Sequence, residues 1–478
     1  MLFNSIEFWL FLPIVWVVYF LMPFKTRWIW LLLASYFFYG FWKIEFAGLM
    51  LLTSLIDWYC AKRVSQSEIK KVRLFWMWLA VGTDLAMLFM FKYFDFALGN
   101  TPISSYLYSH DATAWIIELG KYTIPAGISF YTFQSISYVV DVYRGSEKPE
   151  PNPIKFMLFV SFFPQLVAGP IERFGLLHGQ LFKDYFPKLE DLKNGFRLML
   201  FGLFLKVGVA DNLAGIVDVF YADSAKFGLL DTWLAAFSFT FQVYYDFFGY
   251  SLLAQGSALL FGINLMDNFN KPFHAGSIPE FWQRWHISLS TWFRDYIFIP
   301  VGGNKHGKLV LSLAVMLVFF TSGLWHGANS TMIYFGLSQG ILYLIDRFVI
   351  GRIGSENAVG LFLRRVKTAV FFMITLVFFR SNTLDQSFDV YQQLFGYHEK
   401  ENVLEPGLTS LPNLEMPMYI LVFLGIAFVL DHLVMKVRVD KWMGQQSLIF
   451  RWVIYVGLIS AVLLKGGAVN HPFVYFQF

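Results

Sequence analysis

LVLSLAVMLVFFTSGLWHGANS, residues 309–330, is an apolar run that ends in a histidine. No charged side chain occurs from Leu309 to Trp325, and His326 follows directly, ahead of small and polar residues. About 20 apolar residues are enough to cross the hydrocarbon core of a bilayer as a helix. The run therefore predicts a membrane helix with an ionisable imidazole near one end.

The composition of the whole chain points to the same class of protein. The 478 residues are 57% hydrophobic and 15% charged, with a mean hydropathy of +0.53. Soluble proteins carry about 25% charged residues, so this chain has too little charge to cover a soluble surface. Apolar runs recur from end to end, which predicts one polytopic membrane domain over residues 1–478. Several runs are short or broken by Gly and Pro, which is tolerated at membrane depth only inside protein or beside a cavity.

Several classes of function are excluded by the sequence. The net charge of +4 is spread out, so we expect no nucleic-acid partner. Cys60 is the only cysteine, and the nine histidines lack metal-ligand spacing, so neither an intramolecular disulfide nor a metal site is expected. GGNKHGK at 302–308 resembles a phosphate-binding loop, but Leu309 stands where Ser or Thr is needed.

A second stretch, SIPEFWQRWHISLSTWFRDYIFIP at 277–300, predicts an amphipathic helix of about 20 residues. Ser277 and Glu280 fit the S-x-x-E capping box of a helix start. At helical spacing Trp282 and His286 share an apolar, aromatic face. The stretch is too polar to cross lipid alone, so we expect it in the interface or along a cavity.

His286 and His326 are thus two histidines in apolar surroundings. Each could be structural, donating to a backbone carbonyl, but ionisable residues within membrane segments indicate function by default. Imidazole is the side chain best suited to accept a proton near neutral pH. Ser322 lies one helical turn before His326, so a Ser–His nucleophile pair is an alternative.

Two further polar residues lie in apolar segments. Asp246, in QVYYDFFGYS at 242–251, could position a histidine or accept from backbone N–H groups. Gln134, in the segment 124–141, is expected mainly to join helices by hydrogen bonding.

The motifs together resemble the membrane-bound O-acyltransferase family. The similarity rests on NFNKPFHAGSIPEFWQRWHISLSTWFRDYIFIPVGGN at 268–304, followed by TSGLWHGA at 321–328. FFPQLVAGPIER and FQVYYDFFGYS lie upstream in the matching order, so the resemblance covers about residues 120–350, the expected catalytic core. It implies an all-α membrane bundle of about 11 transmembrane helices, with re-entrant and interfacial helices that enclose a tunnel.

The resemblance also implies roles for individual residues. His326 and His286 match the catalytic histidines, and Trp285 and Trp325 would wall the site. The expected substrate or tunnel residues are Ser322, Asp246, Gln134 and Asn268. Phe248 and Leu252 depart from the family pattern, since both replace polar residues.

Within the family, the chain is most similar to bacterial polysaccharide O-acetylases of the alginate and peptidoglycan type. This implies a multi-pass protein of the bacterial cytoplasmic membrane, in contact with lipid. It would move an acetyl group from a cytoplasmic thioester such as acetyl-CoA, with no bound cofactor. The acceptor would be an extracytoplasmic polysaccharide, or a partner protein that passes on the acetyl group. The alternatives are D-alanyl transfer to teichoic acid and a transporter, whose sites use interrupted helices.

Overall fold

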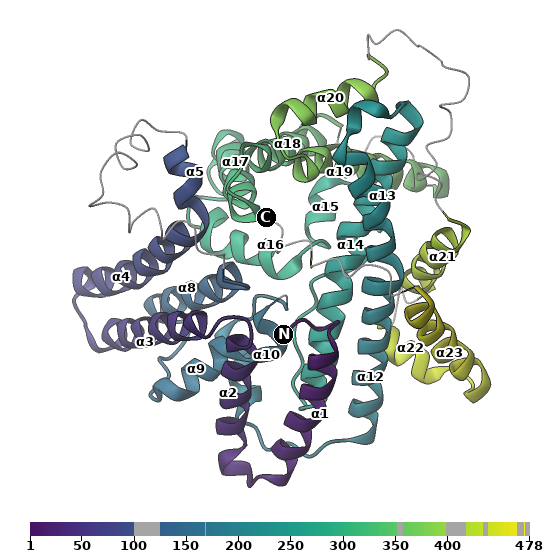
Figure 1. The fold of residues 1–478 in the computed structure, drawn as a ribbon. Helices are drawn as coiled ribbons and strands as arrows, with labels where there is room; N and C mark the ends of the chain where they lie inside the picture. Colours follow the sequence, from purple (N-terminus) through teal and green to yellow (C-terminus); the bar gives the residue numbers. More distant parts are fainter. Residues whose placement is uncertain are drawn as a thin grey trace, which may run out of the picture. The chain divides into compact units, whose positions relative to one another are not determined.

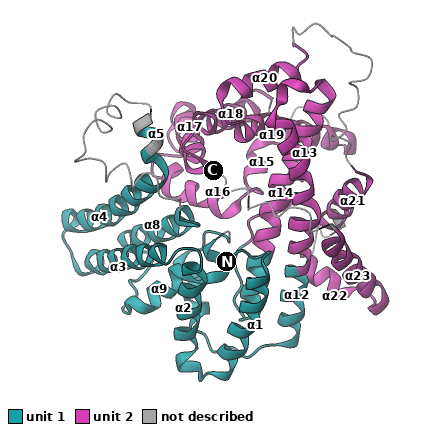
Figure 2. Ribbon diagram, in the orientation of Figure 1, with its two compact units in different colours: residues 1–199, 253–266 teal, residues 200–252, 267–478 magenta. Residues whose placement is uncertain are grey.

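The structure, a computed structural model, describes residues 1–99, 125–167, 169–350, 357–397, 417–433, 438–465 and Phe473. Every regular element within these residues is a helix (Figure 1), so the prediction of an all-α protein is confirmed. The helices form two compact units, shown in separate colours in Figure 2: residues 1–199 with 253–266, and residues 200–252 with 267–478. That the chain acts as one polytopic domain stays a prediction.

Unit 1 contains the N-terminal helices. They are α1 (Ile6–Leu21), α2 (Phe24–Gly40), α3 (Ile44–Gln66), α4 (Lys70–Leu88), η1 (Phe89–Tyr93), α5 (Phe94–Gly99), α8 (Ile128–Arg144), α9 (Pro153–Ser161), α10 (Phe163–Leu166), α11 (Phe174–Leu181) and most of α12 (Leu189–Leu203). Helices α3, α4 and α8 pack against one another. They bury two carboxyl groups, Asp57 on α3 and Asp84 on α4, among the hydroxyl groups of α8.

Unit 2 contains the remaining helices. They are η3 (Phe204–Ala210), α13 (Asp211–Ala222), η4 (Ser224–Lys226), most of α14 (Leu229–Leu259), η5 (Pro272–His274), α15 (Ile278–Trp282), α16 (Ile287–Phe293), η6 (Arg294–Phe298), α17 (Gly307–His326), α18 (Ser330–Ile345), η7 (Asp346–Ile350), α19 (Ala358–Arg380), α20 (Leu384–Leu394), α21 (Met418–Leu433), α22 (Val439–Gln445) and α23 (Leu448–Lys465). Both motif histidines belong to this unit.

Among the residues that the structure describes, five helices are long and apolar enough to cross a membrane, judged by length and composition. They are Ile44–Gln66, Lys70–Tyr93, Leu189–Ala222, Gly307–His326 and Ser330–Ile350. The predicted membrane helix at 309–326 is therefore confirmed. Leu309, Leu313 and Leu317 lie along one side of α17 with exposed fractions of 74%, 60% and 42%, which is the side that lipid would cover. The count of about 11 crossings stays a prediction.

Helices α17 and α18 pack side by side (Figure 1). Their backbones approach closely at two glycines. A Cβ atom on Gly323 would lie 2.3 Å from the carbonyl oxygen of Met332. A Cβ atom on Gly336 would lie 2.2 Å from the carbonyl oxygen of Phe319. Small residues at such crossings let membrane helices approach to backbone contact. This contact fixes the last turn of α17, which carries His326, against α18.

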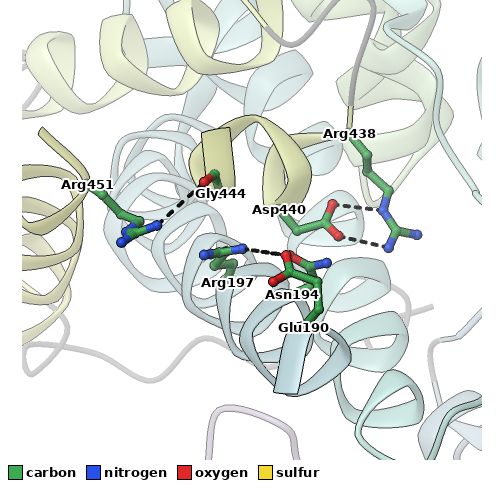
Figure 3. Close-up of polar contacts among 7 residues, drawn as sticks. All are labelled: Glu190, Asn194, Arg197, Arg438, Asp440, Gly444 and Arg451. Atoms are coloured by element: carbon green, nitrogen blue, oxygen red, sulfur yellow. Dashed lines mark hydrogen bonds and ion pairs between the residues drawn. The ribbon is translucent and has the colours of Figure 1, made fainter. Parts of the chain in front are cut away.

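Arginine side chains make short polar contacts within each unit (Figure 3). In unit 1, Arg197 donates to Oδ1 of Asn194 at 2.7 Å, one turn earlier on α12. In unit 2, Arg438 donates to both carboxylate oxygens of the buried Asp440, at 2.8 and 3.0 Å. A bidentate arginine–carboxylate pair is among the strong polar contacts, and the charge of Asp440 also suits the first turn of α22.

Gly323→Ala should destabilise the protein by about 1–3 kcal/mol, because the added methyl group collides with the backbone of α18. The measurement is the thermal midpoint of unfolding in detergent. Gly215→Ala on α13 is the matched control, since nothing lies within 4 Å of its Cβ position. Equal midpoints for the two variants would contradict the close helix contact.

Candidate active site

The first motif histidine, His286, lies in a turn between α15 and α16. Its backbone is left-handed, with φ 45° and ψ 54°, so the predicted continuous helix over 277–300 is wrong. Helix α15 ends at Trp282 and α16 begins at Ile287. The break turns the side chain of His286 into the protein interior, where the residue is 1% exposed.

The start of α15 follows the predicted capping pattern in part. Ser277 Oγ accepts the N–H of Glu280 at 3.2 Å, as a capping box requires. The carboxylate of Glu280 accepts instead from the N–H of Gly276 at 2.9 Å and from Arg284. The helix start was therefore predictable, whereas its end was not.

The second histidine, His326, is the last residue of α17. Its residue surface is 5% exposed, and Gly327 ends the helix in an extended conformation. The imidazole makes edge contacts with Phe335 of α18 and Phe379 of α19, at ring-centre distances of 5.9 and 5.3 Å. These rings surround the imidazole with apolar surface and keep bulk water away from it.

One indole, that of Trp325, contacts both imidazoles. Its ring centre lies 5.8 Å from that of His286 and 4.9 Å from that of His326. Phe247 of α14 packs edge-on against His286 at 4.6 Å. The structure thus brings together, around one indole, two histidines that are 40 positions apart in the sequence, whereas their catalytic roles stay a prediction.

Trp285 packs on the other side of the His286 turn. Its ring lies 5.0 Å from Phe269, 5.5 Å from Phe281 and 4.8 Å from Phe372, measured between ring centres. The residue is 3% exposed. Trp285 therefore forms part of the aromatic core behind His286, and its predicted role as a wall of the site stays a prediction.

Asn268 joins two helices at the same turn. Its amide Nδ2 donates to Ser251 Oγ of α14 at 3.0 Å, and its Oδ1 accepts from Ser288 of α16 at 2.6 Å. Its backbone carbonyl accepts the N–H of Ile287 at 2.8 Å. The residue is 1% exposed, so its polar atoms are used inside the protein. Whether it also touches substrate stays a prediction.

Asp246 belongs to a buried ionic cluster. Lys206 Nζ lies 2.7 Å from Oδ1 of Asp246 and 2.7 Å from Oδ1 of Asp211. Lys206 sits in η3, a π-helical stretch between α12 and α13, and is 1% exposed. The sequence suggested that Asp246 positions a histidine or accepts from backbone N–H groups. The structure shows a third role, in which Asp246 pairs with a buried lysine. The cluster ties α14 to η3 one residue before Phe247, which contacts His286.

A cavity of about 520 Å³ lies within unit 2; its lining includes Ile287, the residue after His286, but neither histidine. Trp282, Phe319 and Ser322 line it, together with Arg294 and Arg347. Ser322 is 5% exposed, whereas both arginines are exposed at the surface. The lining of the cavity thus includes two exposed arginines and a buried serine that lies one helical turn before His326 on α17.

Gln134, the remaining predicted residue, belongs to unit 1. Its Nε2 donates to the carbonyl oxygen of Phe159 at 2.9 Å, and Gln165 donates to its Oε1 at 3.3 Å. These bonds join α8 to α9 and α10. They agree with the expected role of Gln134 in joining helices.

The electrostatic surroundings keep His286 neutral. Its turn lies outside the five helices that could span a membrane, and burial alone lowers the pKa of the imidazole to about 3. A neutral imidazole can donate one hydrogen bond and accept another. His286 is thus suited to hydrogen bonding rather than to carrying charge. Among the residues that the structure describes, no three His, Cys, Asp or Glu side chains gather as a metal site.

Sequence reasoning missed Lys206, Asp211 and the aromatic contacts of Phe247 and Phe379. Lys206 had a detectable signal, because a lysine inside the apolar run FGLFLKVGVA requires a buried partner. The contacts of Phe247 and Phe379 had none, since 56 phenylalanines are spread over the chain.

Comparison with known proteins identifies the family. A model of the membrane-bound O-acyltransferase family matches residues 146–381. The probable alginate O-acetylase AlgI of Azotobacter vinelandii is 36% identical over 429 residues, which cover 89% of this chain and 84% of that protein. The chain belongs to the membrane-bound O-acyltransferase family. The family resemblance read from the motifs is confirmed, and the protein is an O-acyltransferase, which replaces the transporter alternative.

Two other relatives show the range of this acyltransferase group. The peptidoglycan O-acetyltransferase of Helicobacter pylori is 32% identical and covers 83% of this chain and 80% of its own length. The teichoic acid D-alanyltransferase of Bacillus subtilis is 30% identical over 233 residues, which cover 46% of this chain and 58% of that protein. The similarity to the two O-acetylating relatives thus extends over more of this chain than the similarity to the D-alanyltransferase does.

Lys206→Met should destabilise the acyltransferase by about 3–5 kcal/mol, because two buried carboxylates lose their shared cation. The triple variant with Asp211→Asn and Asp246→Asn should regain most of that stability, since no buried charge is left unpaired. The measurement is the thermal midpoint in detergent. Lys226→Met, which breaks an exposed pair with Asp223, is the control. A wild-type thermal midpoint for the Lys206→Met variant would refute the stabilising role of the ionic cluster.

Proposed function

We propose that this acyltransferase moves an acetyl group from a cytoplasmic thioester to hydroxyl groups of an extracytoplasmic polysaccharide. The observation that carries the proposal is the cavity whose lining includes Ser322, one helical turn before His326. The names of two relatives, an alginate O-acetylase and a peptidoglycan O-acetyltransferase, support acetyl as the group and a polysaccharide as the acceptor. Since those relatives are bacterial, the bacterial cytoplasmic membrane is the proposed location.

The donor enters the cavity beside its two exposed lining arginines, Arg294 and Arg347. Arg347 follows α18 and Lys305 and Lys308 flank the start of α17, so basic residues gather where this helix pair begins and ends. Basic residues mark the cytoplasmic ends of membrane helices. Acetyl-CoA carries phosphate groups, for which arginine is the preferred partner. With its phosphates bound to Arg294 and Arg347, the donor would place its thioester along α17, toward His326.

His326 is the general base of the proposed reaction. It accepts the proton of the acceptor hydroxyl as the hydroxyl oxygen bonds to the acetyl carbon. The carbon–sulfur bond then breaks, and the leaving sulfur takes the proton back from the imidazolium. His286, neutral and buried, donates a hydrogen bond to the carbonyl oxygen as negative charge develops there. Trp325, between the two imidazoles, keeps water out.

The acceptor reaches His326 from the end of α17 opposite the basic loop. A glycan chain, or a partner protein that carries the acetyl group to the glycan, would meet the thioester there. D-alanyl transfer to teichoic acid is the alternative within the family, and the shorter shared length of the D-alanyltransferase favours acetyl.

His326→Ala should lower acetyl transfer by about 10²–10⁴-fold, the usual effect of losing a positioned general base. His286→Ala should lower it by a smaller factor. The measurement is acetate released by mild base from the glycan of cells that contain equal membrane levels of each variant. His306→Ala, which removes an exposed histidine before α17, is the control.

A wild-type amount of released acetate in the His326→Ala variant would refute the role of His326 as general base. If the wild-type protein adds no acetate, D-alanine ester in the same extracts decides whether the alternative family reaction replaces acetylation.

Arg347→Ala should raise the concentration of acetyl-CoA needed for half-maximal transfer by about tenfold, because one phosphate contact is lost before the reaction begins. The maximal rate should change little. The assay is transfer from radiolabelled acetyl-CoA in membrane vesicles opened by detergent. Arg365→Ala, whose guanidinium donates to the carbonyl oxygen of His274, is the matched control. A lower maximal rate at unchanged half-saturation would contradict the donor path.

A further inference from the structure

His286 holds a backbone conformation that side chains other than glycine rarely adopt. Its φ of 45° is one of two positive values at non-glycine positions in the described residues. Such conformations cost about 1–3 kcal/mol and persist only where the surroundings enforce them. The residue therefore needs partners that hold the turn.

Asn268 supplies contacts on the C-terminal side of this turn. Its backbone carbonyl accepts from Ile287, the residue directly after His286, at 2.8 Å. Its side-chain Oδ1 accepts from the hydroxyl of Ser288 at 2.6 Å. Both bonds fall within the first turn of α16, so they fix where this helix starts.

The other end of the Asn268 amide is anchored on α14. Nδ2 donates to Ser251 Oγ at 3.0 Å, and Ser251 is 2% exposed. Phe247 lies one helical turn earlier on α14 and contacts the imidazole of His286 at 4.6 Å. Residues four apart share one helix face. One face of α14 thus locates the ring of His286 through Phe247 and its backbone through Asn268.

We propose that Asn268 is a positioning residue that acts on acetyl transfer through His286. The proposal rests on the role given to His286 under the proposed function. Asn268 holds α16 against α14, and the imidazole then points at the carbonyl oxygen of the donor. Displacing a catalytic group by 1 Å can cost about 10²-fold in rate. Loss of the hydrogen bonds that Asn268 makes to α16 and α14 would therefore slow the reaction without any contact between Asn268 and substrate.

Asn268→Ala should lower the initial rate of acetyl transfer by about 10–100-fold. The rate is measured as base-labile radiolabel in the glycan after a short pulse of labelled acetate, in cells with matched membrane levels. Thr240→Ala is the control, because Thr240 is a buried hydroxyl on α14 that donates only to Ala236 of its own helix. A normal rate for Asn268→Ala would overturn the proposal.

The decisive comparison combines Asn268→Ala with His286→Ala. If Asn268 acts through His286, the double variant is no slower than His286→Ala alone, since a residue cannot position a side chain that is absent. A rate reduced by the product of the two single effects would overturn the proposal and assign Asn268 a general structural role. A normal rate for His286→Ala alone would instead overturn the proposed function of His286.

A second pair of variants tests the proposal if the Asn268→Ala protein does not accumulate in the membrane. Ser288→Ala removes the hydroxyl that Asn268 accepts from, and Ser288→Thr retains it. We expect a loss of rate with Ser288→Ala and recovery with Ser288→Thr. Equal rates in the two variants would overturn the proposal that the Ser288–Asn268 hydrogen bond positions His286.

Discussion

The backbone contact between α17 and α18 is the constraint on which the proposed site depends. Gly323 and Gly336 leave no room for a side chain between these helices, so their relative height and rotation are fixed. His326 follows Gly323 by one turn and meets Phe335, the neighbour of Gly336. The position of His326, the proposed base, is therefore set by helix packing, which is stiffer than a loop.

The second constraint is the cost of polar groups in an apolar interior. Two buried polar clusters of the histidine region are paired, with Lys206 between two carboxylates and Asn268 between two serines. An unpaired buried charge or amide would cost several kcal/mol. The aromatic rings around the imidazoles supply the apolar medium in which a neutral histidine is an effective base or donor.

Much of this arrangement could be predicted from local sequence. The apolar run before His326 marked α17, and Ser277 marked the start of α15. The break at His286 was not predictable, because the spacing of Trp282 and His286 also fits an unbroken helix. At this break the start of α16 is bonded to a nonlocal partner, Asn268, which lies 20 positions before Ser288. Hydrogen bonds across such separations leave no periodic pattern in the sequence.

The measurement that tests the central claim most directly is an experimental structure with a non-reacting thioether analogue of acetyl-CoA. We expect the phosphates at Arg294 and Arg347, and the carbonyl carbon about 3–4 Å from an acceptor position beside His326. The carbonyl oxygen should face His286. An analogue bound outside this cavity, or an acetyl group remote from both histidines, would contradict the account.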